Sequence, residues 1–192
     1  MKNYFTKKDE ELKWKSGESK ILLSTVVCKV TSRHKISAQG IEGDYITMEA
    51  PDWVIVVPEI DGSFYMVKQW RQSSDCLSIE FPGGVIDKGE SPLEAAKREL
   101  EEETGCRAKE IVKIGELNPN PALFNNRVHF YYASALEETG KQHLDSDEFI
   151  SCLKLSKEEV LEGIGTKQFP HAMMTTAFLF YLRYTKQISL NK

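Results

Sequence analysis

The chain has 192 residues, of which 41% are hydrophobic and 28% are charged, and its formal net charge is −4. This size allows one domain with a buried core, or one domain with a small additional layer. A negative net charge without a long run of lysine or arginine argues against a nucleic-acid-binding protein. No apolar run is long enough to span a membrane, and the N-terminal stretch lacks the apolar core of a signal peptide. The four cysteines show no zinc-binding spacing, so we expect a cytoplasmic protein with reduced thiols.

The first half of the chain is predicted to be rich in β-strands. Residues 1–15 are polar and are expected to be lightly packed, whereas β-branched residues predict strands over residues 20–30, 44–49 and 53–58. The Asp61-Gly62 pair between two apolar runs predicts a β-hairpin with a second strand over residues 64–68. A short strand over residues 77–81 then leads into a Pro-Gly-Gly turn.

A helix is predicted over residues 92–104. Ser91 and Glu94 form a capping box, Pro92 takes the first helical position and Gly105 favours the end of the helix. Because successive helical residues are rotated by about 100°, Leu93, Ala96, Leu100 and Thr104 lie on one face, which is expected to be buried.

A dense cluster of carboxylates lies beside this predicted buried face. Glu99, Glu102 and Glu103 fall within an arc of roughly 100° by the same helical geometry. Like charges on neighbouring turns repel, so the cluster needs either open solvent or cations. A solvated acidic face is the alternative to a metal site. Hard divalent cations such as Mg²⁺ take oxygen ligands and suit phosphate chemistry.

The second half of the chain predicts further strands and two helices. Strands are expected over residues 110–116, 127–134 and 148–155. Ser156 and Glu159 form a second capping box, which predicts a short helix to residue 163, and an amphipathic helix is expected over residues 170–187. This order predicts an α/β (α+β) sandwich with a mixed sheet.

The residues from position 84 to position 106 resemble the Nudix box. The segment reads Gly84, five residues, Glu90, seven residues, then Arg98-Glu99-Leu100-x-Glu102-Glu103-x-Gly105-Cys106. Cys106 stands where an aliphatic or aromatic residue is usual. The resemblance implies a Nudix-type α/β/α sandwich over residues 51–192 and hydrolysis of a nucleoside diphosphate linked to another moiety. It also implies a requirement for Mg²⁺, with Mn²⁺ as an alternative.

The resemblance also assigns roles within the box. It implies metal ligands at the Gly83 carbonyl, Glu99, Glu102 and Glu103, and a catalytic role for Glu103. In the family, the residues that match Glu90 and Arg98 form an ion pair that holds the loop against the helix. Glu90 could instead contact a second metal ion.

Two segments outside the box are similar to the ADP-ribose and nucleoside-diphosphate-sugar pyrophosphatase subgroup. Trp70-Arg71-Gln72 resembles a Gln-Tyr-Arg segment, which implies that Arg71 binds the substrate diphosphate; a surface ion pair is the alternative. Pro121 lies at the offset after the box that marks this subgroup, which implies a substrate contact. Ala122 replaces the usual glycine, and an ordinary Pro/Asn loop is the alternative.

A general base is implied in an acidic loop late in the chain. Glu148 is the first candidate, while Asp145 and Asp147 stay open because they lie in the same loop. A solvated acidic turn is the alternative reading of this segment.

Residues 1–50 resemble the N-terminal β layer that helps to form dimers in the ADP-ribose subgroup. The resemblance implies a homodimer in which Tyr45, or otherwise Trp14, stacks on the nucleobase. The expected substrate is ADP-ribose or a related nucleoside diphosphate sugar, cleaved to a nucleoside monophosphate and a sugar phosphate. The alternatives are a dinucleoside polyphosphate, NADH or a GDP-sugar, or a non-catalytic domain that senses a nucleotide. No nucleic-acid or membrane partner is expected.

Overall fold

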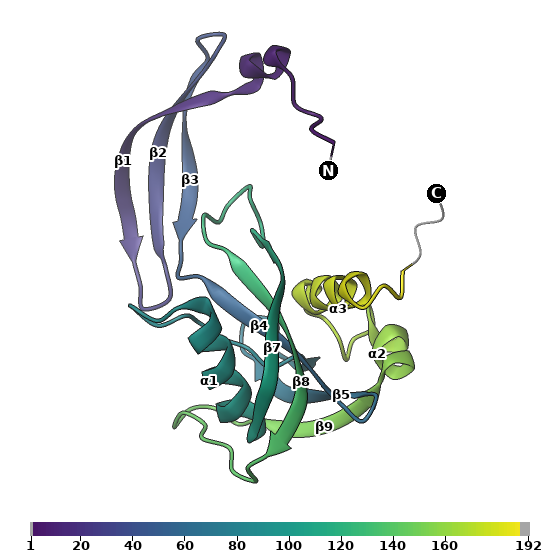
Figure 1. The fold of residues 1–192 in the computed structure, drawn as a ribbon. Helices are drawn as coiled ribbons and strands as arrows, with labels where there is room; N and C mark the ends of the chain where they lie inside the picture. The colour runs from purple at the N-terminus through teal and green to yellow at the C-terminus, as the bar shows by residue number, and fades with distance from the viewer. Residues whose placement is uncertain (1, 189–192) are drawn as a thin grey trace. The chain divides into compact units, whose positions relative to one another are not determined.

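The computed structural model describes residues 2–188, which form two compact units (Figure 1). The first unit runs up to Pro51 and also includes Asn118–Asn126, and the second unit comprises the other described residues. We predicted a division at residue 50, which differs from this partition because residues 118–126 join the first unit.

The first unit contains a short 3₁₀-helix and an antiparallel sheet in the order β1-β2-β3. The 3₁₀-helix is Lys7–Leu12, and the strands are β1 (Trp14–Ser24), β2 (Lys29–Ser37) and β3 (Glu42–Glu49). The prediction of one strand over residues 20–30 is therefore wrong. The hydroxyl of Thr25 accepts the N–H of Cys28 at 3.1 Å and donates to its carbonyl at 2.9 Å, which closes a turn between β1 and β2. Strand β2 was not predicted as a separate strand because most of its residues are polar.

The segment 118–126 is attached to β3 by backbone hydrogen bonds. Met48 N–H donates to the Leu123 carbonyl at 2.7 Å, and Asn125 N–H donates to the Met48 carbonyl at 3.3 Å. The side-chain amide of Asn118 donates to two carbonyls of the same segment. These contacts explain why a stretch so distant in sequence belongs to the first unit.

The second unit contains a mixed sheet in the order β6-β5-β4-β8-β7, with β9 paired to β5. Strands β4 and β8 are parallel, and the other neighbours are antiparallel. The predicted hairpin is confirmed, because Asp61 and Gly62 both have positive φ between β4 and β5. The strands are β4 (Trp53–Ile60), β5 (Ser63–Arg71), β6 (Cys76–Glu80), β7 (Cys106–Leu117), β8 (Val128–Glu138) and β9 (Ser151–Ser156).

Helices cover both faces of this sheet (Figure 1). Alternate residues of β4 point to opposite faces: Val54 and Val56 pack with α1 (Pro92–Thr104), whereas Ile55 and Val57 pack with α3 (Ala172–Tyr184). A third helix, α2 (Lys157–Gly163), contributes Val160 to the second of these cores. The predicted α/β/α sandwich is confirmed.

The predicted helices are confirmed with adjusted limits. The Ser91 capping box begins α1 and the left-handed Gly105 ends it, as expected, and the Ser156 capping box begins α2. Leu93 is 39% exposed, so its predicted burial is wrong, and Ala95 is buried instead. The face that contacts the sheet is rotated toward Glu99 and Glu103. Strand β9 begins at Ser151, which leaves Glu148 in the preceding loop.

Candidate active site

The loop after β6 brings its backbone close to α1. Val56 N–H donates to the Pro82 carbonyl and Val54 N–H donates to the Gly84 carbonyl, both at 2.9 Å. A Cβ atom on Gly83 would lie 2.2 Å from the Val54 carbonyl oxygen, and one on Gly84 would lie 2.5 Å from Oε1 of Glu99. Gly83 is therefore required for the close approach to the β4 backbone, whereas a side chain at position 84 would displace the Glu99 carboxylate. Within residues 2–188, the carbonyl of Gly83 accepts no hydrogen bond.

Two carboxylates of α1 are buried against this loop. Glu103 is 3% exposed, and its Oε2 accepts the N–H of Gly83 at 2.8 Å. Burial raises the pKa of Glu103 to about 8, and the charges of Glu99 and Glu148 add to the effect. Burial likewise raises the pKa of Glu99 to about 7. A neighbouring cation would favour the ionised forms of both groups.

Arg98 donates hydrogen bonds to three carboxylates. Its Nη1 donates to Glu99 at 2.8 Å and to Glu102 at 2.9 Å. Its Nε and Nη2 donate to Glu90, both at 2.9 Å, so the predicted Glu90–Arg98 ion pair is present. Among the residues described here, no three His, Cys, Asp or Glu side chains already surround one ion position. Nη1 of Arg98 bridges Glu99 and Glu102, and the Gly83 N–H donates to Glu103.

The acidic loop between β8 and β9 is anchored to the end of α1. His143 N–H donates to the Glu102 carbonyl at 2.9 Å, and the side-chain amide of Gln142 donates to the Glu103 carbonyl. Glu148 is exposed, and its charge helps to raise the pKa of Glu99 and Glu103, behind burial as the main cause.

Arg71 forms an ion pair, but it differs from the surface ion pair that we considered as the alternative, because its partner Glu80 is buried. Its Nε and Nη2 donate to the two oxygens of Glu80 at 2.7 and 2.6 Å. The Glu80 side chain is only 1% exposed, and it also accepts Nδ1 of His171 at 2.9 Å. Sequence reasoning assigned no role to Glu80 or His171. The acidic Glu80 in an otherwise short apolar strand was the available signal, because a buried carboxylate requires partners.

The other predicted substrate contacts belong to the first unit. The rings of Trp14 and Tyr45, which we predicted as alternatives, pack edge to face with centroids 5.4 Å apart. Pro121 is exposed in the segment attached to β3. The structure thus brings together Gly83, the box carboxylates and the loop carrying Glu148 in the second unit, and Trp14 with Tyr45 in the first.

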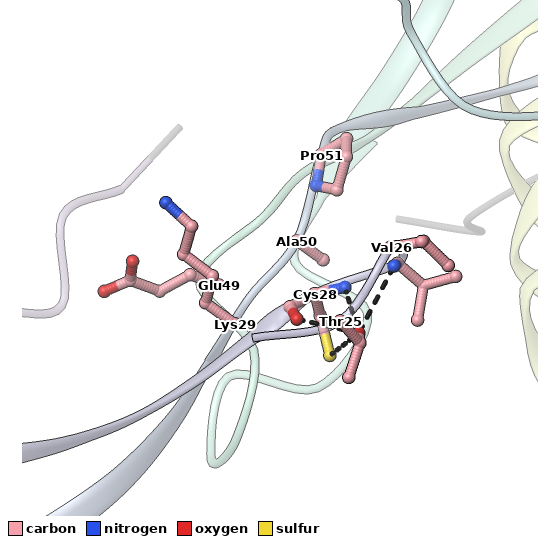
Figure 2. A pocket seen from close by; sticks show the side chains of 8 residues that line it. Thr25, Val26, Cys28, Lys29, Glu49, Ala50 and Pro51 are labelled. Atoms are coloured by element: carbon pink, nitrogen blue, oxygen red, sulfur yellow. Dashed lines mark hydrogen bonds between the residues drawn. The ribbon is translucent and has the colours of Figure 1, made fainter. Parts of the chain in front are cut away.

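A cavity of about 290 Å³ in the first unit lies at the β1–β2 turn (Figure 2). Thr25, Cys28, Lys29 and Glu49 are among the residues that line it. None of the predicted site residues lines this cavity, so it takes no part in the candidate active site.

Comparison with known proteins identifies the family. A family model described as the NUDIX domain matches residues 48–174. The chain is also 35% identical to the ADP-ribose pyrophosphatase of Bacillus subtilis over 135 residues, which cover 69% of this chain and 71% of that protein. The chain belongs to the Nudix family. This Nudix hydrolase therefore acts on phosphoanhydride bonds, and enzymes of the family generally use divalent metal ions.

Other relatives of this Nudix hydrolase support the same placement. It is 31% identical to the ADP-sugar pyrophosphatase of Mus musculus over 137 residues, which cover 62% of this chain and 61% of that protein. A crystal structure of an ADP compounds hydrolase shares its fold, with a TM-score of 0.81 at 22% identity, over 91% of this chain and 95% of the other. Within residues 2–188, no helix has the length and apolar character needed to cross a membrane.

Proposed function

We propose that this Nudix hydrolase cleaves the diphosphate of ADP-ribose or of a related nucleoside diphosphate sugar. The products are a nucleoside monophosphate and a sugar phosphate. The observation that carries the substrate assignment is the 35% identity to an ADP-ribose pyrophosphatase over most of both chains. The ADP-sugar pyrophosphatase from mouse supports the same class of substrate.

The box residues fit a divalent cation, which we propose to be Mg²⁺, with Mn²⁺ as an alternative. Glu99, Glu102, Glu103 and the Gly83 carbonyl would hold it, since all four offer oxygen atoms, which hard cations prefer. The burial of Glu99 and Glu103 supports this fit, because burial raises their pKa values and a divalent cation would favour their ionised forms. When bound, a divalent cation neutralises charge on the phosphoryl oxygens and polarises them.

Glu148 is our proposed general base. It would take a proton from a water molecule whose oxygen forms a bond to one phosphorus, while the anhydride P–O bond breaks and its oxygen leaves with the other phosphate. The charge of Glu148 contributes to the raised pKa values of Glu99 and Glu103, which supports Glu148 as the first candidate, and Asp145 and Asp147 are the alternatives. Arg71 would bind the diphosphate through the part of its guanidinium that Glu80 does not use.

The proposal also covers further substrate contacts, the oligomeric state and the cellular location. Tyr45, or otherwise Trp14, would stack on the base, and Pro121 would contact the substrate. The enzyme would act as a homodimer and would need no nucleic-acid or membrane partner. We infer a cytoplasmic location, supported by the free thiols of the four cysteines.

A panel of nucleotides with Mg²⁺, separated by chromatography, tests the proposal. ADP-ribose or another nucleoside diphosphate sugar should be the preferred substrate and should yield the two monophosphate products. Preference for a dinucleoside polyphosphate, NADH or a GDP-sugar would mean that the enzyme is a Nudix hydrolase with a different substrate. No hydrolysis of any member of the panel would contradict the catalytic assignment and favour a nucleotide-sensing domain.

A further inference from the structure

The side chains of Arg71, Glu80 and His171 form a cluster centred on the buried carboxylate of Glu80. Oε1 of Glu80 accepts a hydrogen bond from Nε of Arg71. Oε2 accepts hydrogen bonds from Nη2 of Arg71 and Nδ1 of His171. Burial opposes ionisation of Glu80, but the hydrogen bonds from Arg71 and His171 prevail and lower its pKa to about 2. The carboxylate at the centre of the cluster is therefore ionised.

The ionised carboxylate determines which nitrogens of its partners stay free. A carboxylate can only accept hydrogen bonds, so Nδ1 of His171 must carry a proton. In the described part of the chain, the other ring nitrogen, Nε2, has no partner, and neither does Nη1 of Arg71. The side chains of Arg71 and His171 are 39% and 32% exposed. Each thus keeps a free nitrogen on a side chain that solvent can reach.

The cluster lies beside the carboxylates of the candidate active site. Glu80 precedes Gly83 by one short turn, and Gly83 N–H is bonded to Glu103. The pKa of Arg71 is raised mainly by its hydrogen bonds to Glu80, and the charges of Glu103 and Glu148 also contribute. The backbone N–H of Phe81 donates to the sulfur of Met174 at 3.0 Å. This contact holds the start of α3 next to the residue that follows Glu80.

The position of His171 on α3 points to a role other than helix capping. His171 is the N-cap residue of α3, yet its side chain makes no capping hydrogen bond. The ring is bonded to Glu80 instead, across to a different strand. The side chain is therefore placed by the site and not by the needs of its own helix.

We propose that Glu80 holds Arg71 and His171 together as a two-residue binding site for the substrate diphosphate, so that His171 contacts the substrate. This inference rests on the proposed function, since it takes the substrate to be a nucleoside diphosphate sugar. A guanidinium paired with a carboxylate has no net charge, so Arg71 alone is a weak anion site. With a proton on both ring nitrogens, His171 would add a positive charge and donate from Nε2, while Arg71 donates from Nη1.

Calorimetric titration with inorganic pyrophosphate, in EDTA and at about pH 6, tests this site, because histidine side chains in general are largely protonated there. Compared with the wild type, His171→Ala should bind pyrophosphate roughly 10- to 100-fold more weakly, the usual effect of losing a hydrogen bond to a charged group. The control Thr176→Ala removes a half-buried side chain of α3 whose hydroxyl donates to the Ala172 carbonyl of the same helix, and this variant should bind like the wild type. Wild-type affinity in His171→Ala, or no binding by the wild type, would overturn the proposal.

A second measurement uses the wild-type protein alone, in case His171→Ala does not fold. In a ¹⁵N spectrum of the histidine rings, pyrophosphate should shift Nε2 of His171 and leave His34 unchanged. Binding without a shift at His171 would overturn the proposal. Neither measurement needs hydrolysis or a sugar. Failure to hydrolyse ADP-ribose would therefore count against the proposed function only, whereas normal hydrolysis with no His171 response would count against this inference only.

Discussion

At the scale of single residues, burial distinguishes the carboxylates of α1. Glu103 is buried with a pKa raised to about 8, whereas the side chain of Glu102 is 36% exposed and bonded to Arg98. We expect Glu103→Gln and Glu102→Gln both to lower turnover by orders of magnitude with Mg²⁺. Above about pH 8, where Glu103 would be ionised, Glu103→Gln should also raise the melting temperature in EDTA, because it removes a poorly solvated charge while its amide oxygen can still accept a hydrogen bond from Gly83. Near wild-type turnover in both variants would refute the metal-site assignment.

Arg71 has two roles at this scale, and one substitution tests both. Arg71→Ala should raise KM for the substrate more than it lowers kcat, because an arginine on the diphosphate binds ground and transition states alike. It should also destabilise the fold, since it leaves the buried Glu80 carboxylate without its guanidinium partner. Breaking a fully buried pair costs about 3–5 kcal/mol, and the cost here should be smaller because Arg71 is 39% exposed.

Lys68→Ala is the matched control for Arg71→Ala. Lys68 lies on the same strand, β5, and is exposed. Its loss removes one positive charge without unpairing Glu80, so KM and melting temperature should stay near the wild-type values. Equal effects in the two variants would show that Arg71 acts only through the net charge of the strand.

The acidic loop gives a third test at the residue scale. Glu148→Gln should lower kcat by about 10²–10⁴-fold, the usual contribution of a general base, and should leave the affinity for Mg²⁺ unchanged. Asp145→Asn and Asp147→Asn serve as controls from the same loop. A loss of kcat confined to one of these controls would transfer the role to that residue, and full activity in all three variants would remove the loop from the mechanism.

At the scale of elements, α1 depends on its N-terminal cap. The Ser91 hydroxyl accepts the N–H of Glu94, and the Glu94 carboxylate accepts the N–H of Ser91. Ser91→Ala should lower the free energy of unfolding by about 1 kcal/mol and leave kcat nearly unchanged, because the carboxylates lie at the other end of the helix. Denaturant unfolding measures the loss. Ser156→Ala removes the equivalent cap of the shorter α2. Comparing the two variants shows whether the loss of unfolding free energy is the same for both helices.

At the scale of the whole molecule, exposed apolar residues support the proposed dimer. Every residue of β1 is exposed, and an apolar group continues into the following turn with the members Ile21, Leu22, Leu23, Val26 and Val27. Sedimentation should therefore show a homodimer at micromolar concentration. Tyr45→Ala should reduce the preference for ADP-ribose over other diphosphate sugars, with Trp14→Ala as the comparison. A monomer would contradict the dimer, and unchanged selectivity in both variants would leave the N-terminal unit with a structural role only.

The sequence predicted elements well where the determining interactions are local. The caps of α1 and α2 and the Asp61-Gly62 turn all involve residues close together in the chain, and all are confirmed. The merged strand over residues 20–30 failed because the Thr25 turn lies inside a β-branched run. The burial of Leu93 failed because helical periodicity gives a stripe but not the rotation of the helix against its sheet.

The sequence alone determined the family, the α/β/α order of elements and the identity of the box carboxylates, because these depend on spacing along one segment of chain. Only the tertiary structure decided that Glu80 joins Arg71 to His171. Residues 80 and 171 are neighbours because β6 and the start of α3 pack together. A buried carboxylate must find its partners in space, and the sequence carries no local mark of a contact made across the fold.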